Sequence, residues 1–252
     1  EGLPLKAQYT KAFEYSDCWV DDARLVVLNA VSARDNGAEI LPRTDCKSLR
    51  QENGYWVVRV ENTVSGQSRE IFAKAVVNAA GPWVDQIAQM ADIAPIGFTP
   101  YRRSMGRIPA PGGHDVSSWP MIFGANEAWY AKPDAGALIV SPAEEDLMEP
   151  HDVFADDMVL AEGMARYEEN VIEPVTRLLA SWAGLRTFSP DRTLVLGPEP
   201  SEPSFIWCAG QGGYGMQSSP AAGQLLADLV NNKTPAIDAG AVAALNPARF
   251  RS

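Results

Sequence analysis

The chain has 252 residues, of which 46% are hydrophobic and 21% are charged, and this length suits one large domain or two interleaved ones. Its 32 acidic and 21 basic residues give a formal net charge of -11, which repels a phosphate backbone, so we expect no nucleic-acid partner. The apolar runs are too short to span a bilayer. Three widely spaced cysteines (Cys18, Cys46 and Cys208) and two histidines in loop-like sequence indicate neither a disulfide framework nor a metal site, and we expect a cytoplasmic protein.

The N-terminal part of the chain is predicted to form a helix followed by hairpin strands. Asp21 or Asp22 can cap the helix, apolar residues recur at helical spacing, and Gly37 ends it. Asn-Gly and Ser-Gly turns separate the strands that follow. Short apolar or alternating runs predict these strands at residues 38–41, 44–51, 54–62 and 68–75.

The middle of the chain alternates between predicted helices and a predicted sheet. A small apolar strand, a tight turn and a helix are predicted over residues 75–91, with Pro82 in the first helical turn. From about Ile96 to Val140, strand-like runs rich in proline, glycine and aromatic residues predict an antiparallel sheet. Apolar periodicity and an acidic first turn predict a helix within residues 152–175.

The C-terminal part is predicted to contain two strands and one helix. The strands span residues 193–200 and 204–210, and the helix spans residues 218–232, with Ser218 or Ser219 as N-cap and Pro220 at its first position. No strand is predicted after the helix. The whole pattern predicts an α/β fold of mixed α+β character.

A glycine motif, Gly210-x-Gly212-x-x-Gly215, lies between the last strand and the last helix. In a dinucleotide-binding fold this motif opens a strand-helix-strand unit, but here no second strand follows the helix. By itself the motif favours a turn that allows close packing of strand and helix. A second interpretation stays open, because glycines let a ligand approach the backbone and a helix N-terminus attracts electron-rich groups.

Several motifs resemble the D-amino-acid oxidase-like flavoenzymes, the group that holds glycine oxidase and sarcosine oxidase. The segments "VVNAAGPWVDQIA" and "FIWCAGQGGYGMQSSPAAGQLLADLV" occur in this order, with an aromatic-rich sheet between them. Within that group, "PYRRSMG", "EAWYAKPDAG", "SWAGLRTF" and "AGQGGYGMQSS" look most like the bacterial D-arginine dehydrogenases. The resemblance covers the chain from about Phe13 to Val230.

The resemblance implies FAD as the cofactor and implies which residues contact it. The C-terminal glycine loop faces the pyrimidine end of the isoalloxazine ring, and the helix behind it directs its positive end at the N1–C2=O edge. The turn at Gly81 approaches the pyrophosphate and ribityl region, although for Trp83 a packed core position is an open alternative. The implied cofactor residues are Gly81, Pro82, Trp83, Gly212, Gly213, Tyr214, Gly215, Met216 and Gln217.

The resemblance also implies the residues that bind an amino-acid substrate. Arg103 and Arg186 correspond to carboxylate-binding arginines, and the planar guanidinium suits a carboxylate. Tyr130 corresponds to a tyrosine that hydrogen-bonds the same carboxylate, and the carbonyl of Gly213 accepts from the substrate amine. From the residues alone, either arginine could instead pair with a surface carboxylate, Tyr130 could be a core residue, and strand alternation allows only one of Arg102 and Arg103 on the ligand face.

The predicted function is FAD-dependent oxidative deamination of D-amino acids, and we expect an oxidoreductase acting on CH–NH2 groups. Alternatives are a glycine-, sarcosine- or secondary-amine oxidase and a non-catalytic fragment that binds small carboxylates. The chain begins at Glu1 and lacks the family's N-terminal GxGxxG segment, so we expect a C-terminal part that is inactive alone and self-associates. The expected division is a FAD-binding part (16–93 and 187–231), a mixed-sheet substrate-binding part (1–15 and 94–186) and a tail (232–252).

Overall fold

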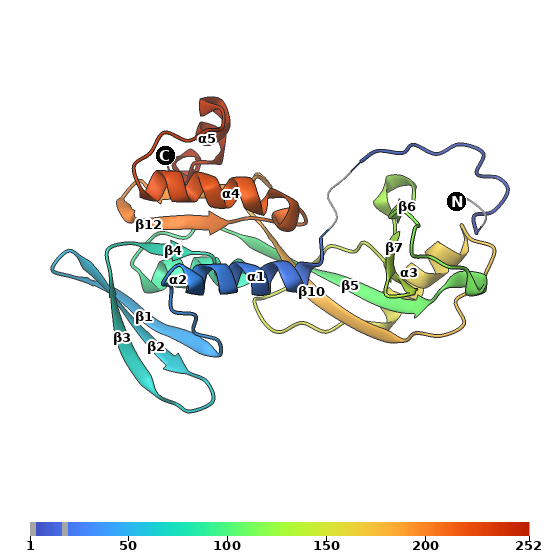
Figure 1. Ribbon diagram of the computed structural model, residues 1–252, viewed down its shortest axis with the longest axis horizontal. Coiled ribbons are helices and arrows are strands. Elements are labelled where there is room, and N and C mark those ends of the chain that lie inside the picture. Colours follow the sequence, from blue (N-terminus) through green and yellow to red (C-terminus); the bar gives the residue numbers. More distant parts are fainter. Residues whose placement is uncertain (1–3, 17–19, 252) are drawn as a thin grey trace. The chain divides into compact units, whose positions relative to one another are not determined.

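The computed structural model describes residues 4–16 and 20–251, so the predicted free cysteine Cys18 lies outside the described residues. The chain divides into two compact units (Figure 1). Unit 1 consists of Glu1–Tyr15 and Pro100–Arg186, and unit 2 consists of Ser16–Thr99 and Thr187–Ser252. Each unit is therefore assembled from two separate stretches of the chain. Over the described ranges, the helices are all too short or too polar to cross a membrane.

Unit 1 is built on a six-stranded sheet, and the predicted antiparallel sheet over residues 96–140 is confirmed. The strand order is β10-β5-β8-β7-β6, with β9 paired to β5. The pairs β5–β8, β7–β8 and β6–β7 are antiparallel. The strands are β5 (Thr99–Pro109), β6 (Ile122–Phe123), β7 (Tyr130–Asp134), β8 (Ala137–Ser141), β9 (Asp146–Leu147) and β10 (Ala180–Phe188).

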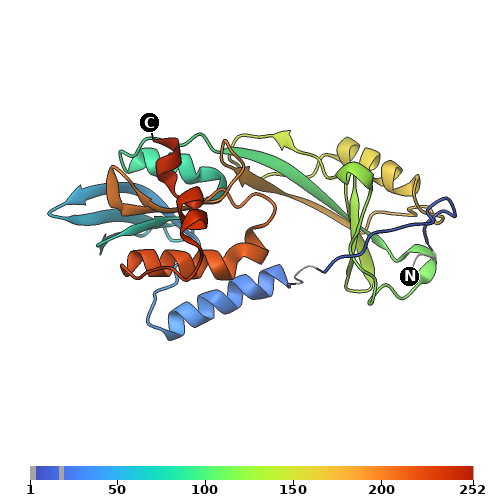
Figure 2. The ribbon, with the colours of Figure 1, turned by 90° about the horizontal axis from the view of Figure 1, so that it is seen from above.

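One helix, α3 (Asp157–Glu168), packs on β8 of this sheet (Figure 2). The carboxylate of Asp156 caps it by accepting from the backbone N–H groups of Met158 and Val159, at 2.9 and 3.1 Å. The helix ends at Glu168, short of the predicted range, and the carboxylate of Glu168 accepts the N–H of Val175 at 2.6 Å.

Unit 2 contains two three-stranded sheets and four α-helices among the described residues. One sheet, β1-β2-β3, is antiparallel throughout and confirms the predicted hairpins. The other has the order β11-β12-β4, with β4 parallel to β12. The elements are α1 (Asp22–Asp35), β1 (Thr44–Glu52), β2 (Tyr55–Asn62), β3 (Ser68–Ala73), β4 (Val76–Asn78), α2 (Val84–Met90), β11 (Val195–Glu199), β12 (Glu202–Ala209), α4 (Gly215–Val230) and α5 (Ala239–Leu245).

Strand β12 is buried on both faces and separates two hydrophobic cores of unit 2. Phe205 and Trp207 on one face pack with Trp56 of β2. Ile206 on the other face packs with Leu225 of α4. Successive side chains of a strand point to opposite faces, so a continuous apolar run fits a strand covered on both sides. Figure 1 shows α4 on one side of β12 and the β1–β3 sheet on the other.

Two predictions about local structure in unit 2 are wrong. Residues 38–41 form no strand, because this short run is largely exposed and has no strand partner among the described residues. Helix α4 begins at Gly215 instead of residue 218 or 219, so Pro220 lies inside it. The hydroxyl of Ser219 donates to the carbonyl of Met216 at 2.9 Å, and Met216 is the residue whose carbonyl the missing N–H of Pro220 would have bound.

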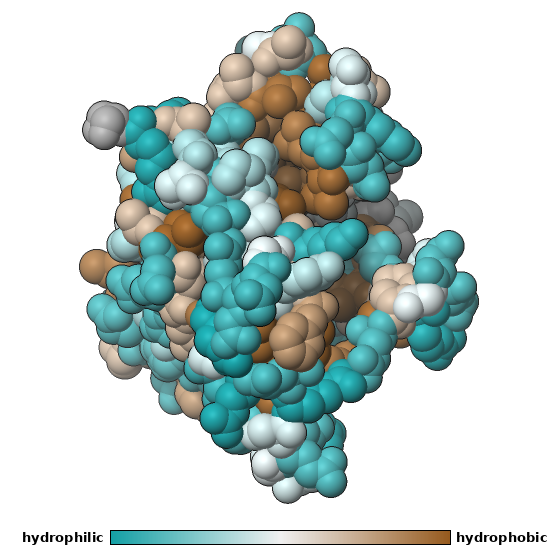
Figure 3. Space-filling model, turned by 90° about the vertical axis from the view of Figure 1, so that its left-hand side faces the viewer, coloured by the Kyte–Doolittle hydropathy of each residue, from teal (hydrophilic) through white to brown (hydrophobic). Residues whose placement is uncertain are grey.

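Apolar side chains remain at the surface of unit 2, and Figure 3 shows hydrophobic residues open at the face that it displays. The predicted helix at the N-terminal end is confirmed as α1, whose N-cap Asp21 accepts from the N–H of Arg24 at 3.1 Å. However, α1 buries no residue, and Val26, Val27 and Leu28 are 50% or more exposed. The apolar side chains of α1 are therefore largely uncovered in the described part of the chain.

A buried carboxylate, Glu199, ties the C-terminal end of the chain into unit 2. Glu199 is 1% exposed and accepts from the guanidinium of Arg251 at 2.8 to 3.2 Å and from the indole of Trp207 at 2.9 Å. Burial raises the pKa of Glu199, but the hydrogen bonds from Arg251, Trp207 and Ser201 outweigh it and leave that pKa below its ordinary value. The carboxylate therefore stays charged in the core.

We predict that Arg251→Ala lowers the free energy of unfolding of unit 2 by about 3–5 kcal/mol, because it leaves the buried Glu199 without its counter-ion. Glu52→Ala, which removes the exposed partner of Arg50, is the control and should change stability little, since solvent screens that pair. Urea denaturation followed by circular dichroism measures both variants. Equal losses from the two substitutions would contradict the structural role of Arg251.

Candidate functional site

Three of the predicted substrate residues lie together in unit 1. A guanidinium nitrogen of Arg186, at the end of β10, donates to the hydroxyl of Tyr130 on β7 at 3.4 Å. Burial lowers the pKa of Arg103, on β5, and the positive charge of Arg186 lowers it further. The Tyr130 hydroxyl has the opposite, smaller electrostatic effect and raises the pKa of Arg103. It also donates a hydrogen bond to the sulfur of Met105 at 3.3 Å. The structure therefore brings Arg103, Tyr130 and Arg186 into one cluster.

Strand alternation separates the two neighbouring arginines of β5. Arg103 and Met105 share one face of the strand, and Arg102 lies on the other. Arg102 donates to Asp146 at 2.6 Å and is opposite it in the β5–β9 pair. Because Tyr130 binds Met105, the face that carries Arg103 is also the face that carries Tyr130. Arg102 is thus an ion-pairing residue away from the cluster.

The cluster carries incompletely paired positive charge. The side chain of Arg103 is only 11% exposed, its Nη2 lies 3.5 Å from Glu145, and its Nε is buried without a hydrogen-bond partner. The negative charge of Glu144 raises the pKa of Arg103. One oxygen of Glu144 accepts a hydrogen bond from the backbone N–H of Ser104 at 2.6 Å. Among the described residues, no carboxylate forms an ion pair with Arg186. Two neighbouring guanidinium groups with free donors suit a carboxylate or another oxyanion.

The glycine loop in unit 2 has the backbone that only glycine adopts easily. Gly210 and Gly212 have φ angles of +74° and +51°. The N–H of Gly212 donates to the carbonyl of Thr187 at 3.0 Å, and a Cβ atom at Gly212 would lie 2.4 Å from the ring of Phe188. Gly212 therefore serves close packing, against Phe188 of β10, and the next residue, Gly213, is exposed.

The last residues of the glycine motif form the first turn of α4. Its N-cap residue, Tyr214, makes no side-chain capping hydrogen bond. Within the described part of the chain, the N–H groups of Gly215, Met216 and Gln217 have no acceptor. Unpaired N–H groups and the helix dipole give this end of α4 a partial positive charge. The helix end can therefore bind an electron-rich group.

A second predicted cofactor segment, Gly81, Pro82 and Trp83, forms a single 3-10 turn between β4 and α2. Gly81 has a φ of +55°, with open space where a Cβ atom would lie. Buried Asn78 fixes the turn by donating to the carbonyl of Val84 at 2.8 Å. Trp83 is 42% exposed, so the alternative of a packed core tryptophan is wrong.

Not every predicted substrate residue joins the cluster in unit 1. Gly213 belongs to unit 2, so its contact with the substrate amine stays a prediction. The sequence interpretation missed Met105, although its place two residues after Arg103 puts it on the same strand face. It also missed Glu145, for which the sequence carries no signal, because the pairing depends on how the chain returns to β5 after β8.

Comparisons with known proteins place the chain among flavoproteins. A family model described as "DAO: FAD dependent oxidoreductase" matches residues 1–229. The chain is 58% identical to D-erythritol 1-phosphate dehydrogenase of Brucella abortus over 87 residues, which are 34% of this chain and 17% of that enzyme. It is 27% identical to the hydrogen cyanide synthase subunit HcnC of Pseudomonas aeruginosa over 241 residues, 93% of this chain and 54% of that subunit.

One of the similar solved structures is L-proline dehydrogenase from P. horikoshii, with a TM-score of 0.74 and 24% identity over 91% of this chain and 60% of that chain. This likeness shows that the predicted mixed α/β flavoenzyme fold is correct. The chain spans about half the length of HcnC and a smaller share of the Brucella enzyme.

We predict that Gly212→Ala destabilises unit 2 by about 2–4 kcal/mol, because the added methyl group collides with Phe188 and the left-handed backbone disfavours alanine. Gly223→Ala is the matched control, since Gly223 lies in α4 with open space at its Cβ position, and it should stabilise the helix by about 0.5–1 kcal/mol. Urea denaturation curves of the two variants should shift in opposite directions, and a Gly212→Ala curve that shows no loss of stability would show that the loop repacks freely.

Proposed function

Because the chain belongs to the DAO family of FAD-dependent oxidoreductases, we propose that it carries the substrate-carboxylate site and the flavin-facing loop of an enzyme that oxidises D-amino acids. FAD is the cofactor of this family. In this proposal unit 1 is the substrate-binding part and unit 2 belongs to the FAD-binding part. The observation that carries the proposal is the cluster of Arg103, Tyr130 and Arg186.

The cluster is suited to an amino-acid carboxylate for electrostatic reasons. Two guanidinium groups near each other repel, and burial makes the charge on Arg103 less favourable still. A bound carboxylate would relieve both costs by accepting hydrogen bonds from Arg103 and Arg186, while Tyr130 would donate a third. The contact between Glu145 and Arg103 is 3.5 Å long, which is too long for Glu145 by itself to satisfy the N–H donors of Arg103.

The proposed reaction requires the chain to position the substrate and not to supply the redox chemistry. FAD, when bound, accepts a hydride from the substrate Cα, and the amino acid becomes an imino acid as its nitrogen loses a proton to solvent or a base. Arg103 and Arg186 would hold the carboxylate and so fix the direction of the Cα–H bond. The carbonyl of Gly213 would accept a hydrogen bond from the amine.

The first turn of α4 fits the isoalloxazine ring that the proposal requires. Gly215, Met216 and Gln217 offer backbone N–H groups without an acceptor in the described chain, and no capping side chain blocks them. Negative charge collects at the N1–C2=O edge of a reduced flavin, and a fixed dipole with free donors stabilises such charge. Trp83 and the open Gly81 turn are the proposed contacts nearer the pyrophosphate and ribityl region.

The proposed substrate class is D-amino acids, with cationic side chains as first candidates because several motifs resemble the D-arginine dehydrogenases. A sarcosine- or glycine-type amine remains the neighbouring alternative, since the two arginines recognise the carboxylate that these amines share with D-amino acids. The proposed location is the cytoplasm. We also propose that the 252-residue chain self-associates, because the apolar residues of α1 are exposed.

A second candidate function is the oxidation of a polyol phosphate. The observation that favours it is the 58% identity between a third of this chain and D-erythritol 1-phosphate dehydrogenase. Arg103 and Arg186 could hold a phosphate group as well as a carboxylate, because arginine binds either anion in a bidentate manner. In this case the hydride would leave a carbon that carries a hydroxyl group, and no amine would be needed.

The two candidates are separated by anaerobic reduction of FAD in the longer enzyme of which this chain is expected to be the C-terminal part, measured by the loss of flavin absorbance. We expect reduction by D-arginine or another D-amino acid, and none by D-erythritol 1-phosphate. Reduction by sarcosine or glycine alone would assign the amine-oxidase class, and reduction by the phosphate alone would overturn the proposal in favour of the second candidate.

We predict that Arg103→Ala and Arg186→Ala each weaken binding of the D-amino acid by about 2–3 kcal/mol, roughly a 30- to 150-fold rise in half-saturation, because each removes a charged hydrogen bond to the carboxylate. Arg107→Ala is the matched control. Arg107 lies on the same face of β5 but is engaged by Asp134 at 2.9 Å. Half-saturation that is unchanged in both cluster variants, or raised equally in the control, would rule out the carboxylate role.

A further inference from the structure

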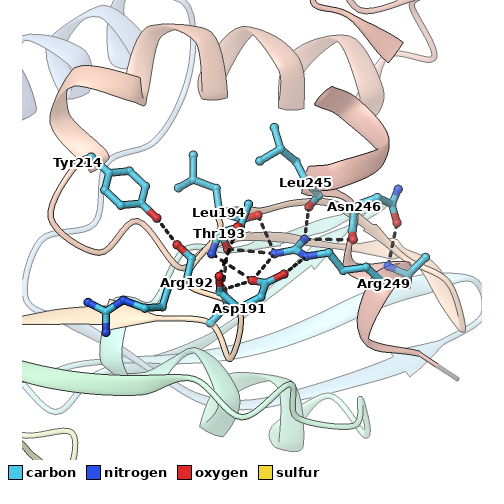
Figure 4. Close-up of polar contacts among 10 residues, drawn as sticks. Asp191, Arg192, Thr193, Leu194, Tyr214, Leu245, Asn246 and Arg249 are labelled. Carbon is cyan, nitrogen blue, oxygen red and sulfur yellow. Dashed lines mark hydrogen bonds and ion pairs between the residues drawn. The ribbon is translucent and has the colours of Figure 1, made fainter. Parts of the chain in front are cut away.

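The segment after α4 contains an arginine whose every N–H donor is used. The family match ends at residue 229, so the α5 segment and the 3-10 turn at Pro247–Phe250 lie beyond it. Within that turn, Arg249 is only 17% exposed. Its Nη1 donates to the carbonyls of Leu245 and Asn246, at 2.8 and 3.2 Å, within its own segment. The rest of its guanidinium points at another part of the chain (Figure 4).

That other part is the loop 189–194, between β10 and β11. Arg249 forms a two-nitrogen ion pair with Asp191, through Nε at 2.7 Å and Nη2 at 3.2 Å. Its Nη2 also donates to the carbonyls of Thr193 and Leu194, at 2.9 and 3.0 Å (Figure 4). The hydrogen bonds from Arg249 lower the pKa of Asp191 to about 2, so the ion pair is intact at neutral pH. Arg249 thus clamps this loop from one side.

The same loop holds the glycine loop and α4 from its other side. The hydroxyl of Tyr214, the N-cap residue of α4, donates to the carbonyl of Arg192 (Figure 4). Thr193 presents its carbonyl to Gly210, where a Cβ atom would lie 3.3 Å from it. Phe188, just before the loop, packs against Gly212, and the guanidinium of Arg192 covers its ring at 3.9 Å.

The loop is held in a backbone conformation that needs such support. Arg192 has a φ of +60°, in the left-handed region that a non-glycine residue adopts at a cost. Asp191 stabilises the turn around it by accepting from the Ser189 hydroxyl at 2.8 Å and the Thr193 N–H at 3.0 Å. The carbonyl of Arg192 can bind Tyr214 only while this turn is kept.

We propose that Arg249 is a positioning residue: through Asp191 and the loop 189–194 it fixes Tyr214, and with it the glycine loop and the first turn of α4. The effect on the flavin rests on the function proposed above, whereas the mechanical link does not. Through this link, the segment after residue 229, which lies outside the family match, determines the position of the first turn of α4.

Hydrogen exchange of backbone amides in the 252-residue chain tests the link. In Arg249→Ala, the amides of Gly212, Tyr214 and Ser218, which are hydrogen-bonded in the loop and at the start of α4, should exchange at least about tenfold faster. Tyr214→Phe, which cuts the link at its other end, should accelerate the same amides. The two effects should not add in the double variant, because both variants break one chain of contacts.

Arg251→Ala is the matched control, because Arg251 is another largely buried tail arginine but binds Glu199 instead of the loop. Because Arg251→Ala lowers the stability of unit 2 as a whole, it should accelerate exchange across unit 2 without singling out the amides of Gly212, Tyr214 and Ser218. Unchanged exchange of these three amides in Arg249→Ala, or an acceleration confined to them in Arg251→Ala, would overturn the proposal. Should Arg249→Ala not fold, Arg249→Lys and Tyr214→Phe decide the question, with lysine expected to restore only part of the protection since it lacks the planar fork.

The longer enzyme, loaded with FAD, provides a second measurement. Arg249→Ala should change the visible absorption and circular dichroism of the bound flavin, and Arg251→Ala should not. Accelerated exchange together with an unchanged flavin spectrum would overturn the flavin-facing role of α4 and leave the mechanical link standing. A changed spectrum without oxidation of D-amino acids would contradict only the proposed substrate.

Discussion

Burial of β12 on both faces is the constraint on which the structure of unit 2 depends. Phe205 and Trp207 must be covered by the β1–β3 sheet and α2, and Ile206 must be covered by α4. The helix can reach its face of the strand only if the chain reverses directly after Ala209, and this reversal is the glycine loop. Close packing of Gly212 on Phe188 is one product of that reversal, and the uncapped first turn of α4 is another. The packing of Gly212 on Phe188 and the uncapped N-terminus of α4 are therefore both consequences of the turn after Ala209.

Charge is handled differently in the two units. In unit 2, the buried carboxylate of Glu199 binds Arg251, and Arg249 binds Asp191 and four carbonyl groups. In unit 1, the Nε of Arg103 is buried without a hydrogen-bond partner, and Arg186 donates to Tyr130 at 3.4 Å. An unsatisfied buried donor costs free energy, which favours the proposal that a ligand binds there.

The relatives divide according to how much of the chain they resemble. The likeness to the Brucella polyol-phosphate enzyme is strong but covers a third of the chain, whereas the likenesses to HcnC and to L-proline dehydrogenase are weaker and cover nine tenths of it. Family membership therefore identifies FAD as the cofactor, but it does not identify the substrate, which depends on the residues of the site. The proposed oxyanion-binding cluster agrees with either group of substrates. The two proposals therefore differ in the carbon that loses the hydride, which carries nitrogen in one case and oxygen in the other.

The sequence by itself determined many of the local elements and supplied the prediction about the cluster. Alternation and hairpin turns were enough for β1 to β3, and the resemblance of the motifs that hold Arg103, Tyr130 and Arg186 was enough to propose a carboxylate site. Only the tertiary structure decided which partners these residues have. The strand at 38–41 was wrong because no second strand pairs with it, and the start of α4 was wrong because Ser219 supplies the hydrogen bond that Pro220 lacks. Residues 232–252 were interpreted as a tail, since nothing in a local pattern shows that Arg249 meets Asp191, 58 residues away. Local propensity depends on neighbours within a few residues, whereas ion pairs and helix caps of this kind depend on contacts that form only when distant segments pack together.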